Sequence, residues 1–165
     1  MVVAMKPLLA LVAVAACSPY SVATTPPPIT AFGPAASTLG TICVIRQSVF
    51  AHAVTFAIHD NGQLVGATRG DSYFCYLAQP GAHAIVSDTG DSTDLPGTTR
   101  LEVRSNQRYW LEQDHDNSFG SITSKLLSID EARAHELVTG CEYMVIVEAP
   151  GHEAVPSPVP LAFAR

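Results

Sequence analysis

One triplet in the chain has the sequence of a known catalytic motif. Asp88-Thr89-Gly90 matches the aspartic-protease triplet and follows the apolar stretch 84–86, which is typical of a strand. Aspartic proteases need two carboxylates that face each other and share one proton. The chain has a single copy of the triplet, so catalysis at Asp88 would require a homodimer. The Asp, Ser, Thr and Gly residues of 88–97 favour an exposed loop instead.

Two acidic segments carry oxygen ligands of the kind that calcium prefers. Asp88, Asp91 and Asp94 recur every third residue, and 114–117 reads Asp-His-Asp-Asn. Neither segment has the Asp-x-Asp-x-Asp-Gly spacing and distal Glu of a calcium loop. The histidines also lack the spacing of a zinc site, and we expect them at the surface or in turns; they are His52, His59, His83, His115, His135 and His152. The sequence predicts no metal site and no cofactor.

Other signatures of catalysis and of nucleic-acid binding are missing from the sequence. It contains no Gly-x-Ser-x-Gly elbow, no P-loop and no dinucleotide fingerprint. The formal charge is −6, from 15 acidic and 9 basic residues, and no block of Lys or Arg occurs. A nucleic-acid partner would require a basic surface. The composition therefore favours a protein that is not an enzyme and does not bind nucleic acid.

Three cysteines follow Cys17 in the sequence, and an oxidising compartment would allow two of them to pair. All three pairings are open. We favour Cys75 with Cys141, because Cys43 lies inside an apolar stretch where a buried thiol is an ordinary core residue.

Four aromatic residues are candidates for a binding face that would contact a glycan or a protein. They are Tyr73, Tyr76, Tyr109 and Trp110. Core packing explains such residues more often than ligand binding does.

The elements that would position these residues are short strands. Residues 42–46 form an apolar strand, and Asn61-Gly62 supplies a type I′ turn between strands 54–60 and 63–68. The same reasoning predicts a hairpin of 73–77 with 82–86, and another of 99–104 with 108–113. The apolar segment 142–148 is predicted to be the last strand, covered on both faces.

One short helix interrupts this pattern near the C-terminal end. Ser128 and Glu131 predict a capping box, the apolar residues 134, 137 and 138 share a face, and Gly140 ends the helix. The sequence predicts a mostly β fold, a small β-sandwich of about seven to nine strands, over residues 41–150. A Pro-rich tail follows at 151–165.

The N-terminal segment predicts export. Lys6 precedes an apolar run that ends in Val14-Ala15-Ala16-Cys17, so 1–16 is predicted to be a signal peptide. The last four residues resemble the bacterial lipobox, which implies a palmitate-bearing lipid anchor on Cys17. By the same resemblance, Ser18 favours the outer membrane, facing the periplasm. Cleavage after Ala16 would instead give a secreted protein, and the run is too short for an uncleaved membrane anchor.

Residues 17–40 are predicted to be a tether. They contain five prolines and no apolar period, and the triplet 26–28 favours polyproline II. Extended throughout, such a tether would reach on the order of 50 Å from the membrane.

A family resemblance supports the same interpretation. The strand that ends at Arg46, the hairpin at 61–66, the segment 70–74 and Pro80-Gly81-Ala82-His83 resemble a family of small bacterial lipoproteins catalogued as domain of unknown function 2846. The similarity covers about 41–138. It implies a β-sandwich lipoprotein and contributes no catalytic residues.

These observations lead to three functional hypotheses. The leading one is a non-enzymatic lipoprotein of the bacterial cell envelope, an accessory or interaction module for a protein or glycan partner. The second is a dedicated glycan-binding module, which needs Trp110 or a tyrosine exposed on a flat sheet face. The third is a hydrolase that uses Asp88, which needs a second carboxylate in the same cleft.

Overall fold

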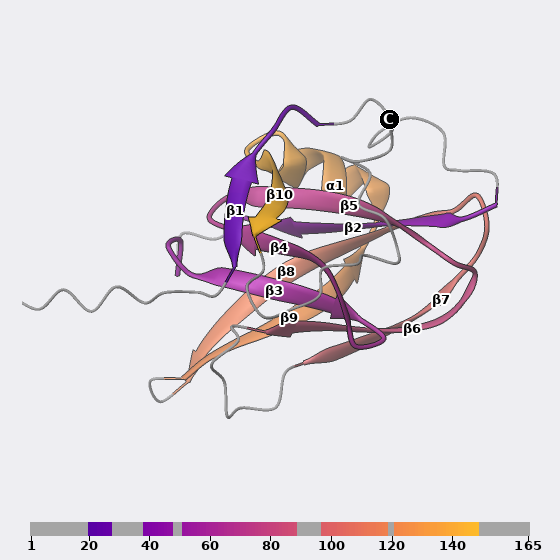
Figure 1. Ribbon diagram of the computed structural model, residues 1–165, viewed down its shortest axis with the longest axis horizontal. Helices are drawn as coiled ribbons and strands as arrows, with labels where there is room; N and C mark the ends of the chain where they lie inside the picture. The colour runs from indigo at the N-terminus through magenta and orange to yellow at the C-terminus, as the bar shows by residue number, and fades with distance from the viewer. Residues whose placement is uncertain (1–19, 28–37, 48–50, 89–96, 119–120, 149–165) are drawn as a thin grey trace, which may run out of the picture.

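The mostly β fold predicted from the sequence is confirmed. The computed structural model describes residues 20–27, 38–47, 51–88, 97–118 and 121–148, which form ten strands in two sheets and one helix (Figure 1). Several predictions fall outside the described residues: the signal peptide 1–16, Cys17, Thr89-Gly90, Asp91, Asp94, and the tail 151–165.

Two sheets face each other, and most of their strand pairs are antiparallel. The larger sheet has the order β1-β10-β5-β2-β8-β9, with β1 (Ser21–Thr24), β10 (Glu142–Glu148), β5 (Ser72–Ala78), β2 (Gly40–Arg46), β8 (Arg108–Ser118) and β9 (Ser121–Ile129). The smaller sheet has the order β4-β3-β6-β7, with β4 (Gln63–Arg69), β3 (Thr55–Asp60), β6 (Gly81–Asp88) and β7 (Thr98–Val103).

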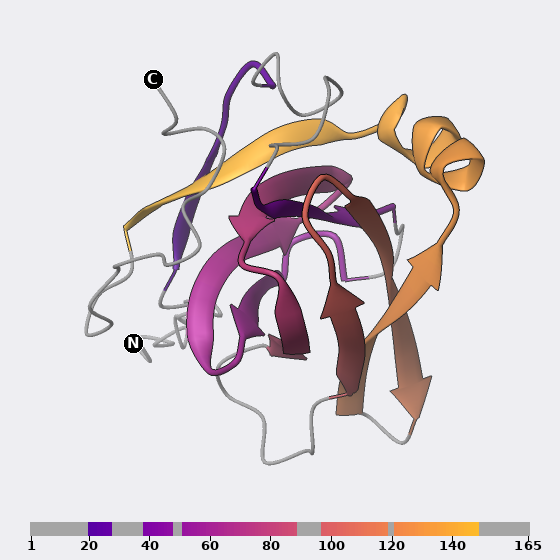
Figure 2. The ribbon, with the colours of Figure 1, turned by 90° about the vertical axis from the view of Figure 1, so that its right-hand side faces the viewer.

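The core has two layers because the larger sheet is covered on both faces. Its inner face packs on the smaller sheet through residues such as Val44, Phe74 and Leu111. Its outer face packs against α1 (Glu131–Val138), which buries Ala134 and Leu137 in the same cluster (Figure 2). Alternation along each strand sends neighbouring side chains to opposite layers.

The structure confirms one predicted hairpin and contradicts two. β3 and β4 pair around Asn61-Gly62, whose φ angles of 48° and 81° are those that a type I′ turn requires. β5 does not pair with β6, and β7 does not pair with β8. At both turns the chain passes from one sheet to the other, so β5 pairs with β2 and β10, while β7 pairs with β6.

Two strands were not predicted. β9 pairs with β8 over its full length, from Ser121 to Ile129. β1 lies inside the predicted tether and pairs with β10. The prediction of a tether over 17–40 is therefore wrong for Ser21–Thr24, because β10 offers these residues an edge to pair with.

The helix is confirmed, but its predicted capping box is wrong. Asp130 is the N-cap, and its Oδ1 accepts a hydrogen bond of 2.8 Å from the backbone N–H of Arg133. Ser128 belongs to β9. The N-cap moves because the strand extends to Ile129 and leaves Asp130 as the first residue free to cap.

Candidate functional site

The four predicted aromatic residues do not form an exposed binding face. Tyr73, Tyr76 and Trp110 are buried, with exposed fractions of 3%, 0% and 4%, and only Tyr109 is half-exposed. Tyr76 stacks on Phe74 in the core. Trp110 lies near the His135 ring of α1, at 6.3 Å between centroids. The prediction of a binding face is wrong because the two sheet faces separate these residues and packing covers each face.

The predicted disulfide is also wrong. Cys75 pairs with Cys43, not with Cys141. The two cysteines occupy directly opposite positions on the antiparallel strands β2 and β5, which brings their side chains to the same face of the sheet. Because β2 and β5 are not neighbours in sequence, sequence spacing alone could not show this register.

Cys141 is a free thiol with little reactivity. It follows α1, is half-buried, and its Sγ donates a hydrogen bond of 3.4 Å to the carbonyl oxygen of Arg46. Burial, together with the negative charge of Asp71, raises the pKa of the Cys141 thiol to about 12. A thiol that stays protonated at neutral pH is a poor nucleophile.

A hollow of about 300 Å³ lies at the N-terminal end of α1. The Arg108 guanidinium lies 5.7 Å from the Trp110 ring centroid and 3.9 Å from the Glu131 carboxylate. Tyr109, Ser128 and Asp130 also line it. Two carboxylates and one guanidinium therefore surround this hollow, beside the capped end of α1.

A second hollow, of about 430 Å³, lies beyond the other end of α1. Tyr73 and Tyr143 meet edge to face on one side of it, with ring centroids 5.1 Å apart, and Pro26-Pro27 lies on the other. Cys141 also lines it. Thr24, Thr25 and Glu142 line it as well, so the hollow has a mixed aromatic and polar lining.

One buried cluster resembles a catalytic triad, but other groups of the protein already take up its hydrogen-bonding atoms. The Asp60 carboxylate accepts from the Tyr76 hydroxyl at 3.1 Å and lies 2.6 Å from His83 Nδ1. His83 Nε2 lies 2.8 Å from the carbonyl oxygen of Gln79. The side chains of Asp60 and His83 are only 1% and 9% exposed. Since both His83 nitrogens face acceptors, the ring has no free nitrogen to transfer a proton to a substrate.

A second buried cluster holds the turn before β3. Arg46 is completely buried, and its guanidinium donates to the carbonyl oxygens of Val54 at 2.7 Å and Ala51 at 2.5 Å. Its Cζ lies 4.7 Å from the Phe56 ring centroid. Burial lowers the pKa of Arg46 to about 10, although Asp71 opposes the shift.

His115 belongs to this second cluster and is neutral there. Its ring packs on Phe56 at 4.5 Å, and both of its nitrogens are buried without a hydrogen-bond partner. Burial and the nearby Arg46 charge lower the pKa of His115 to about 4. The expectation that the histidines lie at the surface or in turns is therefore wrong for His83 and His115.

A third polar group joins the two sheets. Gln113 of β8 accepts from Thr68 at 2.5 Å and donates to Ser87 at 2.8 Å and to Ser124 at 3.0 Å. Ser87 and Ser124 are themselves 2.7 Å apart. All four residues are buried, so they form a closed network inside the core.

Sequence reasoning missed these buried clusters, although one signal was present. Phe56, Ile58 and Asp60 alternate along β3, and all three are buried. A polar residue that continues an inward-facing alternation is expected to need a buried partner.

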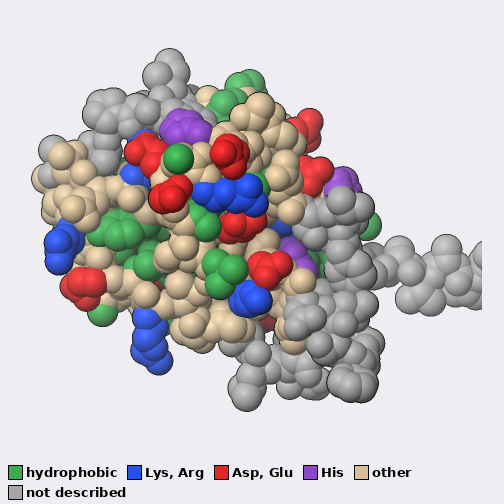
Figure 3. All heavy atoms as spheres, turned by 180° about the vertical axis from the view of Figure 1, so that it is seen from behind, with side chains coloured by type: hydrophobic (Ala, Val, Ile, Leu, Met, Phe, Trp, Pro, Cys, Tyr) green, Lys and Arg blue, Asp and Glu red, His purple; other side chains and the backbone are tan. Residues whose placement is uncertain are grey.

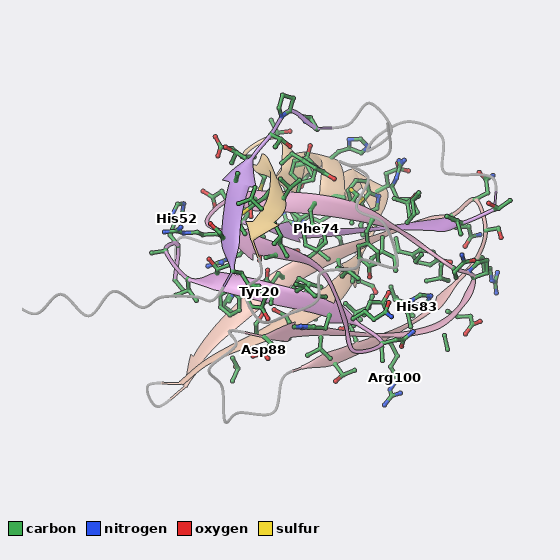
Figure 4. All side chains as sticks on the ribbon, in the orientation of Figure 1. Tyr20, His52, Phe74, His83, Asp88 and Arg100 are labelled. Carbon is green, nitrogen blue, oxygen red and sulfur yellow. A yellow bond between two sulfur atoms is a disulfide. The ribbon has the colours of Figure 1, made fainter. Side chains whose placement is uncertain are left out.

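Asp88 lies at the end of β6, half-buried, beside Tyr20. Its charge adds to burial in raising the pKa of the Tyr20 phenol. Figure 4 shows both residues toward the end of the sandwich opposite His83. Tyr20 therefore lies close enough to the smaller sheet for the Asp88 charge to act on its phenol.

The described residues offer no cluster of three or more metal-binding side chains. Asp114 of the predicted acidic segment pairs with Lys125 at 3.1 Å. On the face seen in Figure 3 acidic and basic side chains are interspersed. Arg133 contacts Glu112 and Glu136 at 3.3 and 3.4 Å. Within the described part of the chain, no helix has the length and apolar character needed to cross a membrane.

Comparisons with protein-family models, with curated proteins and with solved structures give no significant match. The resemblance to the lipoprotein family therefore stays a prediction.

Proposed function

We propose that this chain is a lipid-anchored protein of the bacterial cell envelope whose β-sandwich acts as an accessory or interaction module and not as an enzyme. The observation that carries the proposal is the buried Cys43–Cys75 disulfide. Stable disulfides belong to oxidising compartments, which agrees with the predicted signal peptide and with acylation of Cys17. The outer membrane, facing the periplasm, is the proposed location, and release after cleavage at Ala16 is the alternative.

The two competing functions receive less support. Glycan binding by stacking needs an exposed aromatic platform, whereas Trp110 is 4% exposed. Catalysis needs reactive groups that a substrate can reach, whereas the Asp60–His83 pair is buried and the Cys141 thiol has a pKa of about 12. The hollow at the start of α1 is the proposed contact for a protein or glycan partner.

The proposal is tested by the intact mass of the mature protein from bacterial membranes. We expect a diacylglyceryl mass on the wild-type chain and on the control Cys141→Ala, and its loss in Cys17→Ala. When the protein is denatured without a reducing agent, an alkylating reagent should modify Cys141 alone. A soluble, unmodified chain that begins at Cys17 would contradict lipid anchoring and favour secretion.

A further inference from the structure

The chain becomes fixed in the fold only three residues after Cys17. Tyr20 is 6% exposed, and the Asp88 charge on the smaller sheet contributes to its raised pKa. β1 begins at the next residue, Ser21. Three residues span at most about 11 Å even when fully extended. A lipid on Cys17 would therefore hold the sandwich against the bilayer instead of on a long tether.

The surface next to this attachment point carries an exposed apolar side chain. The register between β1 and β10 shifts between Ser21, which pairs with Glu148, and Val22, which pairs with Ile146. This shift leaves Val147 without an opposite residue, and Val147 is 56% exposed. Leu127, the other large apolar residue exposed in the described part, lies on β9.

The two exposed residues lie toward opposite edges of the same sheet. β1 and β9 are the two edge strands, separated by five strand spacings, or about 24 Å at 4.8 Å each. Figure 1 shows the β1–β10 pair at the edge where the described chain begins. Of the two edges of the larger sheet, the β1–β10 edge is the one within reach of a short link to a lipid.

We propose that the β1–β10 edge is a membrane-docking surface that lies on the bilayer interface, with Val147 in contact with lipid. The inference rests on the proposed acylation of Cys17. It gives the domain a fixed orientation, in which β9 points away from the bilayer.

Fluorescence quenching in vesicles tests this orientation. The full chain, with Cys141→Ser to remove the free thiol, receives a fluorophore through Val147→Cys or, as the matched control, Leu127→Cys. The acylated protein is reconstituted in phosphatidylethanolamine and phosphatidylglycerol vesicles that contain a lipid spin-labelled near its headgroup. We expect quenching several-fold stronger at position 147 than at position 127.

A spacer variant tests the short link itself. About 20 Gly and Ser residues inserted between Ser18 and Pro19 would reach roughly 25 Å as a random coil. We expect this insertion to reduce quenching at position 147 to the value at position 127.

The mass of each reconstituted sample separates the two ways to fail. Equal quenching at both positions in a chain that carries the diacylglyceryl group would overturn the docking surface and leave lipid anchoring intact. A chain without that group would overturn the proposed function and, with it, the docking surface.

Discussion

The two edge strands of the larger sheet are built very differently. β9 has nine residues, all paired with β8, and it is tied to the smaller sheet, since Thr99 donates to the carbonyl of Leu126 at 2.5 Å and Ser124 joins the Gln113 network. β1 has four residues, pairs with β10 and follows the predicted lipid site.

The two edge strands should therefore have different roles: β9 stabilises the domain, and β1 sets its position relative to Cys17. The β9 edge contributes buried hydrogen bonds between the two sheets, so changes there should destabilise the whole domain. The β1 edge adds a short strand whose residues are half-exposed or exposed. Its main effect should be to fix where the chain leaves the fold toward Cys17.

The largest difference between the two edge strands is predicted for a proline substitution in each of them. Proline removes a backbone donor and fixes φ, so its cost in an edge strand grows with the number of ladder and inter-sheet contacts that the strand makes. We expect Thr123→Pro in β9 to lower the free energy of unfolding by about 2 kcal/mol, and Ala23→Pro in the shorter β1 to lower it by about 1 kcal/mol or less. Urea denaturation measures both. Equal losses would remove the distinction between the edges.

The next prediction concerns the polar network behind β9. Gln113→Leu keeps the volume but leaves the fully buried Thr68 hydroxyl without its acceptor. We expect a loss of about 2–3 kcal/mol in the free energy of unfolding, measured in urea. Glu112→Gln is the control on the same strand, since Glu112 pairs with the half-exposed Arg133, and it should change stability by less than about 0.5 kcal/mol. If Gln113→Leu left the free energy of unfolding unchanged, the network would not be what holds the two sheets together.

A third effect, of similar or smaller size, is loss of stability in acid through His115. Its pKa falls from the ordinary 6.5 to about 4 in the folded state, so the unfolded chain takes up its proton first as the pH falls. The contribution is complete above pH 6.5 and is lost progressively down to about pH 4. We expect it to be about 2 kcal/mol.

The variant His115→Leu should remove this part of the acid sensitivity. Denaturation curves from pH 7 to pH 4 measure it, and His135→Gln, at an exposed position on α1, is the comparison variant. If the two variants respond to acid alike, His115 does not lose its charge on folding.

The smallest effect is expected at a surface ion pair of β9. Lys125 and Asp114 lie 3.1 Å apart, and their side chains are 54% and 50% exposed. Lys125→Ala should change the free energy of unfolding by less than about 0.5 kcal/mol. A larger loss would show that β9 depends on its exposed face as well as on its buried one.

The same comparison explains what the sequence could predict. The β3–β4 hairpin and strands β2 and β10 follow from local pattern, because alternation and the Asn61-Gly62 turn act over a few residues. β9 was not predicted because the polar Ser124 is buried and the apolar Leu127 is exposed, which interrupts the usual alternation. β1 was not predicted because its partner strand, β10, lies more than a hundred residues away in the chain.

The site was harder to predict than the fold. Cys43 and Cys75 pair across strands that are distant in sequence, and Trp110 is covered by a helix whose packing no local spacing reveals. Both depend on which strands become neighbours. Tertiary contacts of this kind are set by the whole core and not by a short segment.

Hydrogen exchange on vesicles tests the different roles of the two edges most directly. Peptide-level exchange would be compared between the acylated protein on vesicles and Cys17→Ala in solution. The account predicts slower exchange on the membrane at Ser21–Thr24 and Glu142–Glu148, with no change at Ser121–Ile129. Equal exchange in the two samples, or slowing at β9 instead, would contradict it.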